Sequence, residues 1–100
     1  MTTRVEICKN ATCPIRKTAD LLSDIWTILI VRELILGPKH FCEIEKALEG
    51  ISTRTLTLKL NALIEKGLVK KGEQYSLTKK GEKLSVIFDA MTAYGKKYLA

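Results

Sequence analysis

The sequence predicts a mainly α-helical fold that carries one small β-hairpin. Apolar residues recur at helical spacing along most of the chain, and a glycine-containing turn separates two short candidate strands near residue 72. Almost all of the net charge lies in residues 52–83, which hold eight basic and three acidic side chains, whereas residues 1–50 hold seven of each. A positive charge confined to one structural unit favours a polyanionic partner, above all a nucleic acid.

The size and composition predict a single globular domain over residues 1–100. The chain is 46% hydrophobic and 28% charged, which is typical of a globular protein. Its most apolar run, residues 28–36, contains Arg32 and Glu33 and is far shorter than the roughly 20 residues of a membrane span. The N-terminal residues lack the apolar core of a signal peptide. We therefore expect a cytoplasmic protein without a membrane partner.

The first third of the chain predicts an arm and two helices. Residues 1–12 show no clear period and are expected to form an extended arm. Pro14 suits the first turn of a helix, because its missing N–H costs nothing there, and helical spacing continues to about residue 23 or 24. Residues 26–36 are apolar nearly all round, which is typical of a buried central helix, and Gly37-Pro38 ends this helix.

Two further helices are expected in the middle of the chain. The first is short and amphipathic, beginning near Phe41 and ending at Gly50. The second has Ser52 as a good N-cap, continues through Lys66 and is stopped by Gly67.

Two short strands and a last helix complete the predicted elements. The strands are expected over residues 68–71 and 74–77, joined by the two-residue turn Gly72-Glu73 with glycine first. Thr78 is expected to cap one last helix, whose broad apolar stripe extends toward the C-terminus. A helix, a short turn, a helix and a β-hairpin form, in that order, a winged helix-turn-helix, whose second helix enters the major groove of DNA.

The helix after Ser52 has two different sides when its residues are placed at 100° steps. The apolar side must pack on the other helices and consists of Leu56, Leu60, Leu63 and Ile64. The other side presents Arg54, Thr57, Leu58 and Asn61. Arginine can bind guanine bidentately, asparagine suits adenine, and threonine contacts either base edge or a thymine methyl. The N-terminus of the helix also offers free N–H groups to a phosphate.

Both this face and its aliphatic member have simpler interpretations. Leu58 can contact a thymine methyl, or it can be one of the singly exposed leucines that are common on protein surfaces. The face as a whole can be a merely solvated polar surface. The neighbouring hairpin and the local positive charge favour DNA recognition over that interpretation.

Lysines on both sides of the hairpin are candidate phosphate contacts. Lys79 and Lys80 fall in the first turn of the last helix, where a cation opposes the helix dipole at a cost of about 0.3–1 kcal/mol. Contact with phosphate explains their presence there, although lysines also serve as general solubilising residues. The candidate DNA contacts are therefore Ser52, Thr53, Arg54, Thr57, Leu58, Lys59, Asn61, Lys70, Lys71, Lys79, Lys80, Lys39 and His40.

An ordered set of motifs spans about residues 13–95. It comprises Cys13-Pro14, the run from Asp24 to Leu34, Gly37-Pro38, Phe41, the run from Gly50 to Arg54, Leu56-Thr57, Leu60, Leu63, Gly67-Leu68-Val69 and the run from Tyr75 to Gly81. Together these motifs resemble the HxlR family of winged-helix transcriptional regulators, which are relatives of the MarR type. No single motif is decisive, but their order is specific.

The resemblance implies a homodimer that binds operator DNA and represses or activates nearby genes. In the family the first and last helices build the dimer interface, which corresponds to residues 15–22 and 84–99 here. In several members the cysteine directly before the proline senses oxidants or electrophiles, and Cys13 holds that place. Its modification near the dimer interface would change the spacing of the two recognition helices.

The predicted hairpin departs from the family in one respect. Family wings carry a longer loop than Gly72-Glu73, so this wing is expected to reach the phosphate backbone rather than the minor groove.

The three cysteines leave several alternatives open. An odd number argues against a secreted disulfide framework. The spacing of Cys8, Cys13, His40 and Cys42 permits a zinc site arithmetically, but Cys42 can equally be a small buried hydrophobe. A redox enzyme using Cys8 and Cys13 is disfavoured, because the chain lacks a Cys-x-x-Cys motif beside a βαβ unit. We predict neither a metal nor a cofactor.

These observations predict a homodimeric, sequence-specific double-stranded DNA-binding regulator of transcription that is not an enzyme. A thiol response through Cys13 is an additional expectation from the resemblance. The alternative is a winged-helix module that binds another protein. Such a module would bind its partner independently of salt concentration and would not bind genomic DNA fragments specifically.

Overall fold

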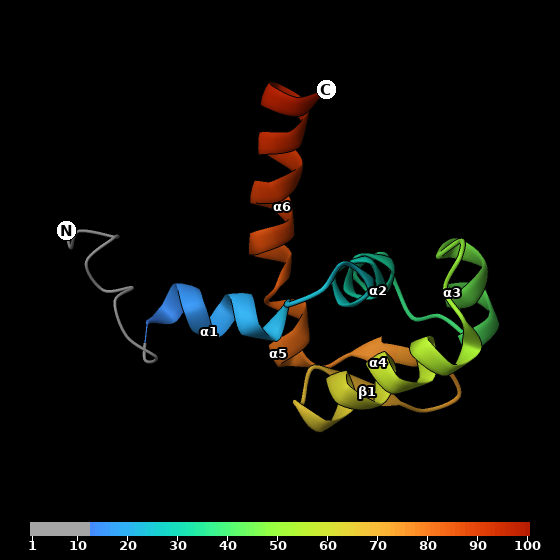
Figure 1. Cartoon of the computed structure of the whole chain (residues 1–100). Coiled ribbons are helices and arrows are strands. Elements are labelled where there is room, and N and C mark those ends of the chain that lie inside the picture. The colour runs from blue at the N-terminus through green and yellow to red at the C-terminus, as the bar shows by residue number, and fades with distance from the viewer. Residues whose placement is uncertain (1–12) are drawn as a thin grey trace.

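The computed structural model describes residues 13–100, and the predicted arm over residues 1–12 lies outside the described residues. The elements are α1 (Pro14–Leu21), α2 (Ile25–Ile35), α3 (Phe41–Ala47), α4 (Thr53–Glu65), β1 (Val69–Lys71), β2 (Tyr75–Leu77), α5 (Lys79–Glu82), α6 (Ser85–Tyr94) and the π-helical segment η2 (Gly95–Leu99). The predicted mainly helical fold with one antiparallel hairpin is confirmed (Figure 1).

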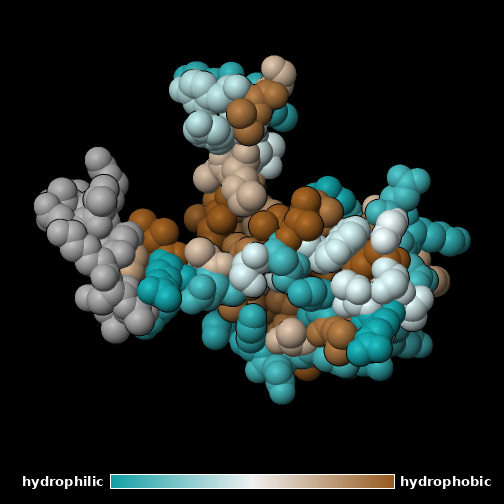
Figure 2. Space-filling view, viewed as in Figure 1, coloured by the Kyte–Doolittle hydropathy of each residue, from teal (hydrophilic) through white to brown (hydrophobic). Residues whose placement is uncertain are grey.

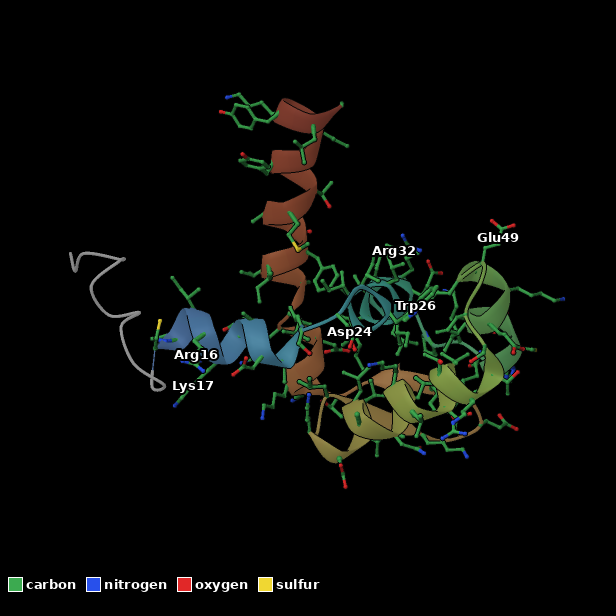
Figure 3. All side chains as sticks on the ribbon, in the orientation of Figure 1. Arg16, Lys17, Asp24, Trp26, Arg32 and Glu49 are labelled. Atoms are coloured by element: carbon green, nitrogen blue, oxygen red, sulfur yellow. The ribbon has the colours of Figure 1, made fainter. Side chains whose placement is uncertain are left out.

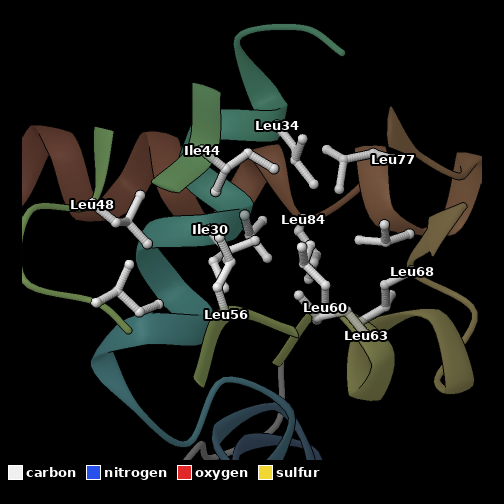
Figure 4. Packing of buried hydrophobic residues seen from close by; sticks show 13 residues of the cluster. Ile30, Leu34, Ile44, Leu48, Leu56, Leu60, Leu63, Leu68, Leu77 and Leu84 are labelled. Carbon is white, nitrogen blue, oxygen red and sulfur yellow. The ribbon is translucent and has the colours of Figure 1, made fainter. Parts of the chain in front are cut away.

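The central position predicted for the second helix is confirmed. Ile30, Val31 and Leu34 of α2 are buried, and α2 packs against α4, α3 and β2. The apolar side of α4 closes the core beneath it with Leu56, Leu60 and Leu63 (Figure 4). This packing leaves the opposite side of α4 in solvent, so the core itself orients the predicted recognition face outward.

The ends of α4 are set by local sequence. The hydroxyl of Ser52 accepts a hydrogen bond from the N–H of Thr55 at 3.0 Å, which caps the N-terminus. At the other end, Gly67 has a φ of +78°. The N–H of Gly67 donates to the carbonyl of Ile64, and the N–H of Leu68 donates to the carbonyl of Leu63. Glycine adopts this left-handed conformation without a Cβ penalty, so the predicted stop is confirmed.

The first helix is shorter than predicted. It ends at Leu21 rather than at residue 23 or 24, because Asp24 caps the next helix. The carboxylate of Asp24 accepts a hydrogen bond from the N–H of Thr27 at 2.8 Å, which requires an extended backbone at residue 24.

The predicted two-residue turn of the hairpin is wrong. The strands pair Val69 with Leu77 and Lys71 with Tyr75, so the loop contains three residues, 72–74. A two-residue turn with glycine first requires a positive φ at that glycine, and Gly72 does not have one. Instead the N–H of Gly72 donates to the carbonyl of Gln74 at 3.1 Å inside the loop.

The predicted single last helix is divided into a short turn and a long helix. Thr78 caps α5 as predicted, with its hydroxyl accepting from the N–H of Gly81 at 3.1 Å. After Lys83, the N–H of Leu84 donates to the carbonyl of Gly81, and the N–H of Ile87 donates to the carbonyl of Leu84. Both bonds span three residues, which is the tighter pattern of a 3₁₀ turn. The long helix α6 begins at Ser85 and extends away from the other elements (Figure 1).

No helix within residues 13–100 is long and apolar enough to cross a membrane.

Candidate nucleic-acid interface

The polar face predicted for α4 lies in solvent. Arg54, Thr57, Leu58 and Asn61 are all exposed, and Leu58 shows 56% of its surface. Together these four residues form the reading face of α4. A guanidinium, an amide, a hydroxyl and an aliphatic side chain on one helical side can contact the edges of bases in a major groove.

Two threonines of α4 already make internal hydrogen bonds. The hydroxyl of Thr57 donates to the carbonyl of Thr53 at 2.9 Å, so its lone pairs remain available to a donor from a base. The hydroxyl of Thr53 donates to a carboxylate oxygen of Glu45 at 2.5 Å. This contact joins the N-terminus of α4 to α3 and thereby helps to set the angle between the two helices.

The structure gives Lys59 an internal partner away from the reading face. Its ammonium lies 2.8 Å from a carboxylate oxygen of Asp24, and each side chain is 33% exposed. Figure 3 shows Asp24 at the N-terminal end of α2, on the side toward α4. The ion pair therefore joins α4 to the start of α2, and Lys59 has a positioning role in this structure.

The pKa of Asp24 is lowered from its ordinary value. Burial alone would raise it, but hydrogen bonds from Lys59 and from the N–H and hydroxyl of Thr27 favour the charged form more strongly. A lowered pKa means that the carboxylate stabilises the fold above the pKa of the unfolded chain, about 3.9. This stabilisation is lost as the pH falls through the folded-state value.

We expect Asp24→Asn to be less stable than the parent at pH 7 by about 0.2–1 kcal/mol, because asparagine caps the helix but cannot pair with Lys59. The difference should shrink below about pH 4, where Asp24 of the unfolded parent chain takes up a proton, and should vanish below the lowered folded-state pKa. Urea unfolding at pH 7 and pH 3 measures it. Asp20→Asn, which removes an exposed carboxylate on α1, is the control; an equal effect of the two substitutions at pH 7 would contradict the assignment.

The wing is the hairpin formed by β1, residues 72–74 and β2, and it is joined to the loop before α3. The N–H of Tyr75 donates to the carbonyl of Lys39 at 2.8 Å, and the N–H of Lys39 donates to the carbonyl of Tyr75 at 2.9 Å. Lys39 thus pairs with β2 like a short third strand. Its ammonium donates to the carbonyl of Glu33 at 3.3 Å, so this predicted contact is also occupied internally.

The remaining predicted lysines are exposed around the wing. Lys70 and Lys71 are on β1, and Lys79 and Lys80 follow β2 in α5. Because α5 is a single turn, its dipole opposes the two lysines less than a long helix would. His40 is exposed at the N-cap of α3, where its backbone N–H donates to the carboxylate of Glu43 at 2.7 Å.

A groove of about 630 Å³ connects the reading face to the wing. It is lined by His40, Phe41, Cys42, Thr57, Lys71, Gly72, Glu73 and Tyr75. Phe41 and Tyr75 line this groove, although their sequence context predicts no contact with DNA. Their apolar character indicates only burial, and the pairing of Tyr75 with Lys39 depends on the tertiary structure.

The cysteines of the described residues lie apart. Cys13 is 1% exposed at the N-terminus of α1, whereas Cys42 is exposed on α3. Figure 1 places α1 and α3 at opposite ends of the molecule. Within residues 13–100 no group of three or more His, Cys, Asp or Glu side chains could hold a metal ion, and Cys8 lies outside that range.

A second surface, apolar, lies between α1, α2 and α6. We call it the α1–α6 surface, a groove of about 480 Å³ lined by Pro14, Ile15, Thr18, Ala19, Leu22, Ile28, Ile87 and Met91. Figure 2 shows hydrophobic residues gathered where α1 approaches α6. A second apolar groove continues along α6 past Met91 to Leu99. The resemblance to the HxlR family implied both helices as interface elements, and both expose apolar side chains.

Comparisons with known proteins agree with this geometry. The HxlR-like helix-turn-helix family model matches residues 21–100. An uncharacterized HTH-type transcriptional regulator of Synechocystis is 36% identical over 95 residues, covering 87% of this chain and 70% of that protein. The HTH-type transcriptional regulator YodB of Bacillus subtilis is 32% identical over 98 residues, covering 89% of this chain and 88% of that protein.

The solved structures that share the fold include two at 32% identity. The crystal structure of quinone-bound YodB from Bacillus subtilis has a TM-score of 0.78 at 32% identity, covering 84% of this chain and 97% of that chain. A structure assigned to the MarR family from Porphyromonas gingivalis has a TM-score of 0.85 at 32% identity, covering 91% of this chain and 97% of that chain.

Proposed function

Because this chain belongs to the HxlR-like helix-turn-helix family of transcriptional regulators, we propose that it binds double-stranded DNA sequence-specifically as a homodimer. The observation that carries the proposal is the exposed reading face of α4 beside a lysine-rich wing. The relatives are named as regulators rather than as enzymes, and the proposed activity is binding.

In this proposal α4 lies in the major groove. Arg54 and Asn61 read base edges by bidentate hydrogen bonds, and Thr57 accepts from a base amino group. Leu58 either packs on a thymine methyl or remains a solvated neighbour. The helix start at Ser52 and Thr53, His40 and the lysines around the wing contact phosphates, which fix the register without reading the sequence. A three-residue wing loop is still short, so we assign it to the backbone rather than to the minor groove.

The α1–α6 surface supports the homodimer. On this surface Ile15 is 58% exposed and Met91 is 47% exposed. In the groove that continues toward the C-terminus, Tyr94 is 59% exposed and Leu99 is 75% exposed. A continuous apolar surface of this kind is typical of a protein interface rather than of a monomer. If a second copy of the chain packs its own α1–α6 surface against this one, both apolar surfaces are covered. The two recognition helices then lie on half-sites one or two helical turns apart.

We also propose that modification of Cys13 changes DNA binding. Its side chain is buried beside Pro14, at the start of the helix that forms one side of the α1–α6 surface. YodB, a relative over most of this chain, was solved in reduced, quinone-bound and diamide-treated forms. An adduct on a buried thiol must displace its neighbours, and a shift of α1 would change the angle between the two protomers.

We expect Arg54→Ala to reduce discrimination between a selected duplex and a scrambled one by about tenfold or more, because one bidentate base contact contributes about 1–3 kcal/mol of discrimination. Lys79→Ala and Lys80→Ala together should instead weaken binding to both duplexes alike and reduce the salt slope by about four, because each protomer of the homodimer loses two phosphate contacts. The duplex is selected from fragmented genomic DNA, and fluorescence anisotropy at several salt concentrations measures the affinities.

Unchanged discrimination in Arg54→Ala would contradict the assignment of the reading face. The thiol proposal is tested by adding an oxidant or a quinone to the same anisotropy measurement and comparing Cys13→Ser with Cys42→Ser. If the DNA affinity of the parent and that of Cys13→Ser changed equally, the thiol proposal would be refuted. Salt-independent binding to a protein, without any selected DNA fragment, would favour the alternative of a protein-binding module.

A further inference from the structure

We propose that Tyr75 is a positioning residue that holds Lys71 toward the groove between the wing and α4, where the ammonium meets a DNA phosphate. The inference rests on the proposed DNA binding and adds to it the residue that orients one of its cationic contacts. It is carried by the backbone pairing of Tyr75, by its ring contacts and by the register of the hairpin.

The backbone of Tyr75 fixes the wing to the body of the protein. Each strand of the hairpin has only three residues, and an isolated two-stranded hairpin is at best marginally stable in water. The two hydrogen bonds between Tyr75 and Lys39, at 2.8 and 2.9 Å, add a third strand-like segment. Tyr75 is therefore the residue at which the tip of the wing is attached to the loop before α3.

The ring of Tyr75 lies near both Phe41 and Lys71. Its centroid is 6.4 Å from that of Phe41, with the rings tilted by 50°, within the range of favourable aromatic pairs. Phe41 and Tyr75 are half-buried and pack against the core. The ammonium of Lys71 lies 5.8 Å from the centroid of the Tyr75 ring, within the distance of a cation–π contact.

The hairpin register makes this contact specific to one lysine. Lys71 is directly opposite Tyr75 in the antiparallel pair, so the two side chains share a face of the hairpin. Lys70 is opposite Ser76 and therefore belongs to the other face. Accordingly Lys71 lines the groove beside Thr57 of α4, and Lys70 is absent from that lining.

Holding Lys71 in place has a consequence for binding. A free lysine loses rotamer freedom when it binds a phosphate, whereas a lysine already held by a ring loses less. The groove lies between the reading face and the wing, where a DNA strand passing from the major to the minor groove would run. Tyr75 thus converts a mobile surface charge into an oriented phosphate contact.

A double-mutant cycle on the full chain tests the proposal. Tyr75→Leu should weaken binding of the selected duplex about two- to fivefold for each protomer, the size of a surface cation–π contact, and so about five- to thirtyfold for the homodimer, while Tyr75→Phe binds like the parent. The loss should vanish in a Lys71→Met background and persist in a Lys70→Met background. Tyr75→Leu should also lower the salt slope, because the Lys71 phosphate contact is weakened.

An equal loss on substitution of Tyr75 with and without Lys71 would overturn the proposal and leave Tyr75 a purely structural role. A second measurement does not depend on any variant. In the free parent protein, the ε-methylene protons of Lys71 should be shifted upfield in the NMR spectrum by the ring current of Tyr75, and those of Lys70 should not. The absence of that shift would overturn the proposal as well. Failure of the parent to distinguish the selected duplex from a scrambled one would instead refute the proposed function.

Discussion

A glutamate in place of Met91 is expected to convert the protein to a monomer and to weaken binding of a duplex with two half-sites by about 10²–10⁴-fold. Met91 is 47% exposed and lines both apolar grooves along α6. In a homodimer that uses the α1–α6 surface, this carboxylate would be buried against apolar side chains without a partner, which is strongly unfavourable. Loss of the second recognition helix removes the gain in affinity from simultaneous binding of two half-sites.

Thr92→Glu is the matched control, because it places the same charge at the next position of α6. Thr92 is exposed and lines neither groove. Sedimentation equilibrium measures the oligomeric state, and anisotropy compares duplexes with one and two half-sites. We expect the control to remain a dimer with nearly parental affinity. A dimeric Met91→Glu protein would place the interface elsewhere on the molecule.

Gly81→Ala is expected to lower the free energy of unfolding by about 1–3 kcal/mol, which corresponds to a decrease in Tm of about 4–8 °C for each kcal/mol. A Cβ at position 81 would clash with the carbonyl oxygen of Leu68 and lie 3.1 Å from a methyl group of Leu77. The Leu68 carbonyl cannot withdraw freely, because it accepts the N–H of Thr78 at 3.0 Å. The clash would separate α5 from the end of α4 and from β2, which together hold the wing.

Gly72→Ala controls for the general effect of adding a methyl group to a glycine. Gly72 is exposed, and a Cβ there would make only an ordinary contact of 3.9 Å with the carbonyl oxygen of Gln74. Thermal unfolding of the two variants at the same protein concentration provides the comparison. We expect Gly72→Ala to unfold close to the parent temperature. Equal destabilisation by both substitutions would show that close packing at Gly81 is not the cause.

Local signals in the sequence predicted the elements that carry the reading face. Ser52 and Gly67 delimit α4 because a cap and a left-handed residue act on their immediate neighbours. The helical spacing of Leu56, Leu60 and Leu63 identified the buried side and, with it, the exposed one. These features depend on residues within a few positions of one another, so a single sequence is sufficient to find them.

Local signals were not sufficient where the same residues fit two backbone conformations. Gly72 could have formed a two-residue turn, but it lacks the positive φ, and the loop has three residues. The apolar stripe after Thr78 suggested one continuous helix, whereas the structure ends α5 at Glu82 and begins α6 at Ser85. The close packing of Gly81 on Leu68 holds α5 against the body, while the rest of the stripe extends outward on α6.

By itself, the sequence determined the helical order, the hairpin, the reading face of α4 and the concentration of positive charge around it. Only the tertiary structure decided which of the charged residues remain available. It pairs Lys59 with Asp24 across 35 positions of sequence and joins Lys39 to Glu33 and Tyr75. It also places Lys71, but not Lys70, over an aromatic ring beside the groove. The physical reason is that an ammonium group binds whichever carboxylate, carbonyl or ring the fold brings within a few ångströms, and sequence spacing does not specify that neighbour.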